Sequence, residues 1–353
     1  MPAESKSERF HEIDLLRFLA AFAVLLFHYT WRGWSADNMS DVSFTGLGEF
    51  FKYGYLGVHL FFIISGFVIL MTAMNKDLTG FTISRITRLF PAYWFAVSLT
   101  ALVTLWIGGT RYQVDIKQYL INLTMLHRFV NVPSVDGVYW SLVVELKFYL
   151  LIFLIILINH IRYIQWYLFG WLAASLILFH FGHIPVIGFF LFPEWSSYFI
   201  AGAVFFLIRR EGMDRYKFIL LLGAYYLSMQ TLYASLHGPP NNGHAVETDT
   251  YLIIAALVSL FYLIFIAIAF GKAHIINRPG FVLLGALTYP VYLIHQNIGF
   301  MLFNVFNTSA NKYILLAAVT GLMLLGAWLI HTQIEKRFAP VLKRALIRVL
   351  PKS

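Results

Sequence analysis

The sequence predicts an all-α integral membrane protein with about ten transmembrane helices and both termini in the cytoplasm. Three observations support this: the composition, the length of the apolar runs and the placement of the cations. Of the 353 residues, 59% are apolar and 12% are charged, and the mean hydropathy is +0.72. A soluble domain of this length can bury a core with far less apolar sequence, so a chain with many membrane spans is expected.

Ten apolar runs are long enough to cross a bilayer. They lie near residues 13–31, 55–75, 82–107, 140–159, 163–181, 186–208, 217–236, 250–270, 281–303 and 312–331. Pro193 and Glu194 interrupt the sixth run, which predicts a kinked or discontinuous helix. The region 108–139 is polar, which predicts a loop with a short helix near 118–130.

Lysine and arginine gather in alternate connections, starting with the N-terminal one. By the positive-inside rule these connections and both termini are cytoplasmic. The net charge of +9 is then a consequence of topology, and no nucleic-acid partner is needed to explain it. Cysteine is absent, which excludes disulfides, thiolate metal sites and a cysteine nucleophile.

The chain divides into a transmembrane domain over residues 1–335 and a basic tail over residues 336–353. In the tail, Val341, Leu342 and Leu346 share one helical face, and Lys343 and Arg344 lie on the other. This pattern is typical of an amphipathic helix on an anionic membrane surface, with lipids as its partner.

The first apolar run carries two ionisable residues, Arg17 and His28. Their spacing brings them within about 20° of one helical face, ~16 Å apart along the axis. Ionisable residues at membrane depth face the protein interior or a wet cavity and are candidates for function. The alternative is structural: Arg17 reaches the headgroups and pairs with Asp14, and His28 hydrogen-bonds at the outer interface.

Arg85 and Arg88 precede the third apolar span on the cytoplasmic side. Cations three residues apart share one side of a helix and repel each other unless an anion lies between them. Guanidinium groups bind phosphate oxygens in pairs, so a phosphate or pyrophosphate is the expected anion. Arg17 is predicted at the same depth.

Other polar groups gather toward the outer side. Glu145 lies about two turns into the fourth run, where it either orients the imidazole of His28 or titrates itself. A structural pair with Lys147 is less favoured, because residues two apart do not face each other on a helix. The ninth run adds His295, with Pro290 expected to kink it. Cations at the inner mouth and acid–base groups outside suit a phosphate-bearing donor and an outer acceptor.

Over nearly its whole length, the sequence resembles the acyltransferase-3 family of bacterial membrane O-acyltransferases. Six stretches carry the resemblance in the family's order: IDLLRFLAAFAVLLFH, GYLGVHLFFIISGFVI, SRITRLFPAYW, YWSLVVELKFYL, LTYPVYLIHQ and IEKRF. Two places depart from the usual motifs. His59 stands where many members have an acidic residue, and Thr288 and Pro290 alter the Tyr-Ser-x-Tyr-Leu-x-His stretch.

The resemblance implies transfer of an acyl group, most often acetyl from acetyl-CoA, to a sugar hydroxyl. The acceptor would be a cell-surface glycan, such as a lipopolysaccharide or exopolysaccharide, or its lipid-linked precursor. The location implied is the bacterial cytoplasmic (inner) membrane, and glycan-assembly proteins are candidate partners. Some members also carry an SGNH hydrolase-like domain; none is expected here, because the sequence after residue 335 is short.

Carried over by position, His28 is the catalytic histidine, and Arg17, Arg85 and Arg88 contact acyl-CoA. From the residues we add Glu145 as a second catalytic group. A supporting set around substrate is expected as well: Asp14, Ser65, Tyr93, Trp140, Ser141, Tyr149, Tyr289 and His295. No metal is expected. A competing class is a proton-coupled transporter or flippase for a glycan or small anion, since buried Arg, His and Glu suit a carrier too.

Overall fold

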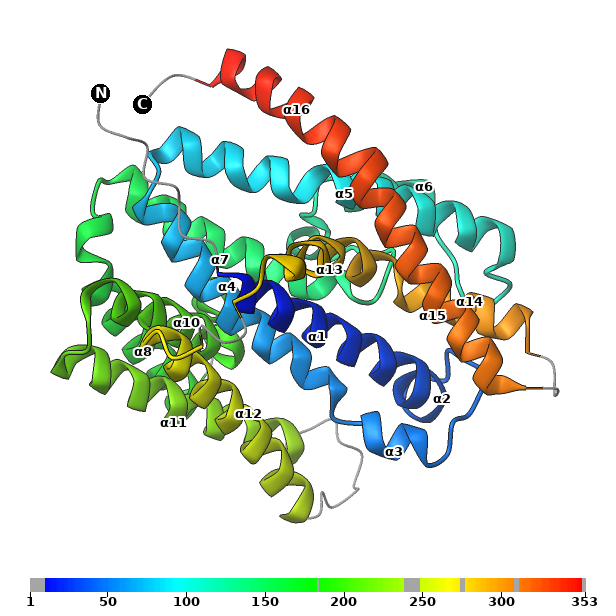
Figure 1. Ribbon diagram of the computed structural model, residues 1–353, viewed down its shortest axis with the longest axis horizontal. Helices are drawn as coiled ribbons and strands as arrows, with labels where there is room; N and C mark the ends of the chain where they lie inside the picture. The colour runs from blue at the N-terminus through cyan, green and yellow to red at the C-terminus, as the bar shows by residue number, and fades with distance from the viewer. Residues whose placement is uncertain (1–9, 183, 238–247, 274–276, 308–310, 351–353) are drawn as a thin grey trace.

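The computed structural model describes residues 10–182, 184–237, 248–273, 277–307 and 311–350, and the regular secondary structure over these residues is helical (Figure 1). The long helices, with the short turns that continue them, are α1 (His11–Phe27) with η1 (His28–Arg32) and α2 (Gly33–Ser35); α3 (Leu47–Phe51) with η2 (Gly54–Leu56) and α4 (Gly57–Met74); α5 (Leu78–Ile107); α7 (Tyr139–Leu157); η4 (Ile161–Tyr163) with α8 (Ile164–Phe181); α9 (Pro185–Leu191) with α10 (Pro193–Glu211); α11 (Arg215–His237); α12 (Thr248–Ala269); η6 (Pro279–Phe281) with α13 (Val282–Ile294) and α14 (Gln296–Val305); and α15 (Lys312–Leu329) with η7 (Ile330–Glu335) and α16 (Lys336–Val349). Two short helices, α6 (Ile116–Leu123) and η3 (His127–Val130), lie between α5 and α7.

Within the described ranges, nine helices are long and apolar enough to cross a membrane, and the bent pair α13–α14 makes a tenth if it is one span. The predicted all-helical, multi-span architecture is therefore confirmed. The expected break in the sixth run is also present. There α9 ends and α10 begins at Phe192, which has a left-handed φ of 38°. The residue before a proline avoids the right-handed α region, so the helix cannot continue unbroken through Phe192. The cytoplasmic placement of the termini stays a prediction.

The helices α4 and α10 pack closely because each has a glycine, without a side chain, at the contact. A Cβ on Gly66 would overlap the carbonyl oxygen of Phe199, and a Cβ on Gly202 would overlap that of Ile63. Small residues let helix backbones approach in membranes, where dispersion and weak polar contacts drive association. This pair forms a rigid wall, and α4 carries Ser65.

The first helix runs through the middle of the bundle and packs on α4 and α13 (Figure 1). Gly285 of α13 leaves room for the carboxylate of Asp14, and Gly57 of α4 leaves room for the carbonyl group of Ala20. The first half of α1 is thereby held close to both neighbouring helices. Its last turn continues into the π-helical segment η1, which begins at His28.

The ninth run is bent by 62° between α13 and α14. Pro290 lies inside α13, but the break itself falls at His295, five residues later. Here the imidazole Nδ1 lies 2.9 Å from the carbonyl oxygen of Tyr292 and 3.2 Å from that of Val291. The side chain thus takes over carbonyl groups at the end of α13, which is how a helix end inside a membrane protein stays satisfied.

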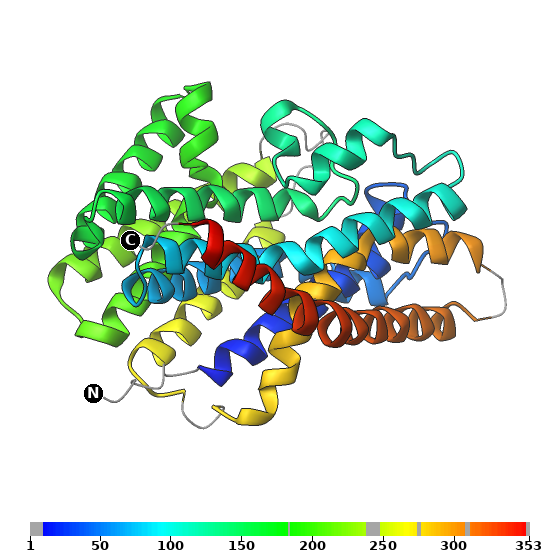
Figure 2. The same ribbon diagram turned by 90° about the horizontal axis from the view of Figure 1, so that it is seen from above.

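The last long helix continues without a loop into the basic tail. α15, η7 and α16 follow one another directly, and α16 packs against α5, as the two views of Figures 1 and 2 show. Its apolar side chains remain exposed: Phe338 is 56% exposed and Val349 is 78% exposed. The separation of residues 336–353 as a membrane-surface tail stays a prediction.

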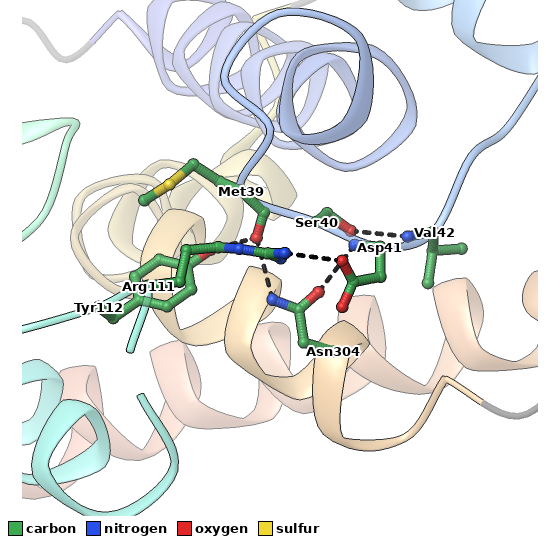
Figure 3. Close-up of polar contacts among 7 residues, drawn as sticks. All are labelled: Met39, Ser40, Asp41, Val42, Arg111, Tyr112 and Asn304. Atoms are coloured by element: carbon green, nitrogen blue, oxygen red, sulfur yellow. Dashed lines mark hydrogen bonds and ion pairs between the residues drawn. The ribbon is translucent and has the colours of Figure 1, made fainter. Parts of the chain in front are cut away.

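The two ends of the bundle differ. At the end where α1 and α5 begin and α10 ends, here called the basic end, Lys76, Arg85, Arg209 and Arg210 lie around one hollow. At the opposite end, loops are joined by polar contacts (Figure 3). The Asp41 carboxylate accepts from Arg111 at 2.9 Å, and the backbone N–H of Asp41 donates to Asn304 Oδ1 at 2.8 Å.

Candidate active site

A cavity of about 110 Å³ lies between α1, α4, α5, α7 and α13. We call it the arginine cavity, because all three arginines predicted to bind the donor line it. Its polar lining comprises Arg17, Arg85, Arg88, Ser65, Ser141, Glu145, Tyr149, Thr288, Tyr289 and Tyr292. The tertiary structure therefore collects most of the predicted site residues, which five different helices contribute.

The three arginines line one cavity, and one of them forms an ion pair with a described residue. Arg88 Nη1 lies 3.6 Å from Glu335 Oε1, whereas Arg17 and Arg85 form no ion pair with any described residue. Arg85 lies over the ring of Tyr149 at 5.8 Å, and Arg88 lies over that of Tyr289 at 5.7 Å. The aromatic faces hold the guanidinium groups in place and leave their N–H groups available for an anion.

Glu145 lies in this cavity and is held by two hydroxyl groups. Ser65 Oγ donates to its Oε1 at 2.5 Å, and Tyr149 donates to the same oxygen at 2.7 Å. The prediction that Glu145 orients the imidazole of His28 is wrong, because Glu145 and His28 have different hydrogen-bond partners. The carboxylate is turned toward the arginines, and the hydrogen-bond partner of His28 is His295.

The two histidines form a buried pair, with His28 Nδ1 3.0 Å from His295 Nε2. The carbonyl oxygens beside His295 Nδ1 only accept, so this nitrogen carries the hydrogen. In a neutral ring the other nitrogen, Nε2, then accepts, and His28 Nδ1 has to donate to it. It follows that His28 Nε2 keeps its lone pair, which is the form a general base needs.

Tyr292 connects the arginine cavity with the histidine pair. Its hydroxyl lies 2.7 Å from Ser141 Oγ at the end of the cavity, and its ring centroid lies 5.6 Å from that of His295. Tyr29, the residue after His28, donates to the carbonyl oxygen of His295 at 2.7 Å. Ser141 and Tyr292 thus lie between the arginine cavity and the histidine pair, whereas Glu145, which the sequence predicted on the outer side, lies among the arginines.

Besides His295, three predicted supporting residues lie outside the cavity lining. Tyr93 donates to the carbonyl oxygen of Asn122 at 2.8 Å, and Trp140 packs on Trp195 with ring centroids 5.1 Å apart. Asp14 is buried next to Gly285. These placements fit roles in packing and in positioning helices. The structure also places His59 in an aromatic cluster, 4.9 Å from the ring of Tyr198.

Two acidic residues near the site were missed by the sequence reasoning. Asp136 is fully buried just before α7 and accepts from the backbone N–H of Val138 at 3.1 Å and of Asn297 at 3.0 Å. Burial raises the pKa of Asp136 to about 7. The signal available was an Asp-Gly pair two residues before the Trp-Ser-Leu motif.

Glu335 is the second acid, and it joins Arg88 to His331, whose Nδ1 lies 2.7 Å from Glu335 Oε2. It is part of the stretch IEKRF, in which the motif alone assigns no role to the acid. Among the described residues no group of three or more histidine, aspartate or glutamate side chains is arranged to hold a metal ion.

A bundle of apolar helices with an arginine-lined cavity beside a buried histidine pair suits group transfer. Comparison with known proteins identifies the class: residues 10–332 match the acyltransferase domain family Acyl_transf_3. The chain belongs to this family, and it is an acyltransferase for groups other than aminoacyl groups. Of the two classes that the sequence left open, the family supports the acyltransferase over the carrier.

Similar proteins carry matching names. A putative acetyltransferase of the Acidianus two-tailed virus is 24% identical over 262 residues, covering 69% of this chain and 73% of the relative. Nodulation protein 10 of Rhizobium leguminosarum bv. viciae is 29% identical, covering 42% of this chain and 44% of the relative. The acyltransferase MdmB of Streptomyces mycarofaciens is 28% identical, covering 38% and 36%. No solved structure matches this chain.

Proposed function

We propose that this acyltransferase moves an acyl group, acetyl in the first instance, from cytoplasmic acyl-CoA to a hydroxyl of a cell-surface or lipid-linked glycan. One observation carries the proposal. The helix α1 places Arg17 in the arginine cavity and, about three turns later, His28 with its Nε2 lone pair free. The same helix thus links a site for phosphate with a site for proton transfer.

The donor enters from the basic end, which the positive-inside rule makes cytoplasmic. Its phosphates are held by Arg17, Arg85 and Arg88 through charge-assisted hydrogen bonds. The pantetheine arm then follows the cavity toward Ser141 and Tyr292, so that the thioester reaches the histidine pair.

In the chemical step the acceptor hydroxyl attacks the thioester carbonyl while His28 Nε2 takes its proton. A C–O bond forms, the C–S bond breaks, and the protonated His28 returns the proton to the leaving thiolate. His295 acts through His28: its Nε2 accepts from His28 Nδ1–H and stabilises the imidazolium as it forms. An alternative route passes the acyl group through His28 as a covalent intermediate.

The assignment of the acetyl group and the assignment of the glycan acceptor are supported by different observations. The putative acetyltransferase among the relatives favours acetyl. The glycan is implied by the motifs that run through the chain, and it would reach His28 from the opposite end of the bundle, where η1 approaches the surface. The enzyme would then lie in the bacterial cytoplasmic membrane with its acceptor outside.

Two measurements test the proposal. The purified protein in lipid nanodiscs should release CoA from acetyl-CoA slowly without acceptor and faster with isolated surface glycan. Cells lacking the gene should produce a glycan lighter by whole acetyl groups. Absence of any acetyl-CoA turnover would overturn the donor assignment, whereas turnover with an unchanged glycan mass would overturn the acceptor.

A further inference from the structure

A second hollow opens beside the arginine cavity at the basic end. It has a volume of about 500 Å³, within the range of small-molecule sites. The end of α4, the start of α5 and the end of α10 surround it. Four of its lining side chains are cations, Lys76, Arg85, Arg209 and Arg210, and we call it the basic chamber.

Arg85 lines both the basic chamber and the arginine cavity. Its Nη2 donates to Ser84 Oγ at 2.8 Å, while its buried Nε has no acceptor among the described residues. A buried guanidinium nitrogen without an acceptor is costly. A ligand that passes from the chamber into the cavity would supply one, because it has to pass this side chain.

The lining of the basic chamber contains no carboxylate in the described part of the chain. Asp77 adjoins Lys76 and offsets part of its charge, and its carboxylate also accepts from the backbone N–H of Gly80 at 2.8 Å as the cap of α5. Burial, and then the nearby cations Arg85 and Lys343, lower the pKa of Lys76. Cations crowded in this way favour an anion with more than one negative charge.

A third hollow, on the other side of α5, differs from the basic chamber because its lining includes a carboxylate. It contains Arg88, Lys336 and Lys343, but also Glu335, which engages Arg88 and His331. Its positive charge is therefore partly neutralised from within. The basic chamber is the better anion site of the two, although both have similar volumes of about 500 and 570 Å³.

We propose that the basic chamber binds the nucleotide end of the donor, with Lys76 and Arg210 holding the 3′-phosphate of CoA. This rests on the proposed function and extends it. Arg85, at the junction of the two hollows, then receives the pyrophosphate together with Arg17 and Arg88, and the pantetheine arm continues along the arginine cavity toward Ser141 and Tyr292. An anionic lipid headgroup offers the same phosphate chemistry and is the competing source.

The experiment compares acetyl-CoA with acetyl-dephospho-CoA, which lacks only the 3′-phosphate. The wild-type protein in phosphatidylcholine nanodiscs should bind acetyl-CoA at least about tenfold more tightly, the worth of one charge-assisted contact. The variants R210A and K76A/R210A should lose this preference by weakening acetyl-CoA alone. K336A removes an exposed cation at the same end and should preserve it. Both substituted positions are exposed, so folding should survive.

Repeating the measurement in nanodiscs with phosphatidylglycerol separates the two sources. If anionic lipid occupies the chamber, the lipid will raise the melting temperature of the wild type but not of K76A/R210A, and the preference for acetyl-CoA will be equal in both. That result, or a wild type that does not distinguish the two donors, overturns this inference and leaves the proposed function standing. A wild type that binds neither donor overturns the proposed function.

Discussion

The arginine cavity and the histidine pair hold their key side chains in different ways. In the cavity, Arg85 and Arg88 are long side chains held by aromatic faces and by one ion pair of 3.6 Å. His28 is held by a 3.0 Å bond to His295, which is in turn anchored to backbone carbonyls at a helix break. The first region can adapt to a charged ligand, whereas the second is set before any ligand arrives.

This difference indicates a division of labour between binding and chemistry. A phosphate site tolerates movement, because several cations share the charge. Proton transfer tolerates little, because the base needs the correct tautomer and direction. Substitutions should therefore separate the two regions, with large effects on turnover at the histidines and smaller effects on affinity at the arginines.

The largest effect is expected for His28→Ala. Loss of the general base should lower kcat by at least ~10²-fold, while acetyl-CoA still binds, because its phosphates lie at the other end of α1. Turnover and calorimetric affinity measured on the same preparation check this. Near-normal turnover, or loss of CoA binding together with turnover, would end the assignment of His28 as the base.

His295 should come next. In His295→Leu the Nδ1–H of His28 loses its acceptor, so the tautomer is no longer set, and kcat should fall by roughly 10- to 100-fold. His295→Gln offers an amide oxygen to His28 and an N–H to the helix carbonyls, so it should recover part of the loss. Equal damage in both variants, with KM and kcat changed together, would mean that His295 only supports the bend.

Arg85→Ala and Arg88→Ala act on the other region. Each removes a contact to the donor phosphates and should raise KM for acetyl-CoA about tenfold with little change in kcat. Arg344→Ala, in the exposed part of α16, is the matched control and should leave KM unchanged. Steady-state kinetics at fixed ionic strength measure both constants. A fall in kcat at constant KM would contradict the division between donor binding at the arginines and chemistry at the histidines.

Glu145→Gln sharpens the comparison, since Glu145 lies in the arginine cavity. The change removes a negative charge but keeps an oxygen for Ser65 and Tyr149. With the cavity more positive, acetyl-CoA should bind about threefold more tightly, and kcat should change little. A drop in kcat of ~10²-fold at constant affinity would instead place Glu145 in the chemistry, as the sequence analysis expected.

The smallest effect concerns Asp136 and stability. Burial raises the pKa of Asp136 to about 7, above its value of ~3.9 in an unfolded chain. Its stabilising contribution is then present below about pH 4 and is lost as pH rises toward 7. The wild type should melt at a lower temperature at pH 8 than at pH 5, and Asp136→Asn should reduce that difference. Glu49→Gln, an exposed carboxylate, should not alter it.

Much of the fold followed from the sequence alone. Runs of about twenty apolar residues can only become spanning helices, since the bilayer leaves backbone groups no other partner. Ten runs were therefore enough to predict the helices, and Pro193 was enough to predict the break at Phe192. Arg17 and His28 could be paired because a helix has a known repeat, and Arg85 and Arg88 for the same reason.

Only the tertiary structure decided which polar groups from different helices meet. Glu145 and His295 were both plausible partners for His28 by depth, since helix periodicity gives height and face but not the neighbouring helix. The bend of 62° at His295 turns its ring toward η1, and the Ser65 hydroxyl draws Glu145 toward the arginines. The sequence by itself determined the helices and the heights of their charges. Packing, through glycine contacts and a broken helix, decided the pairs that form the site.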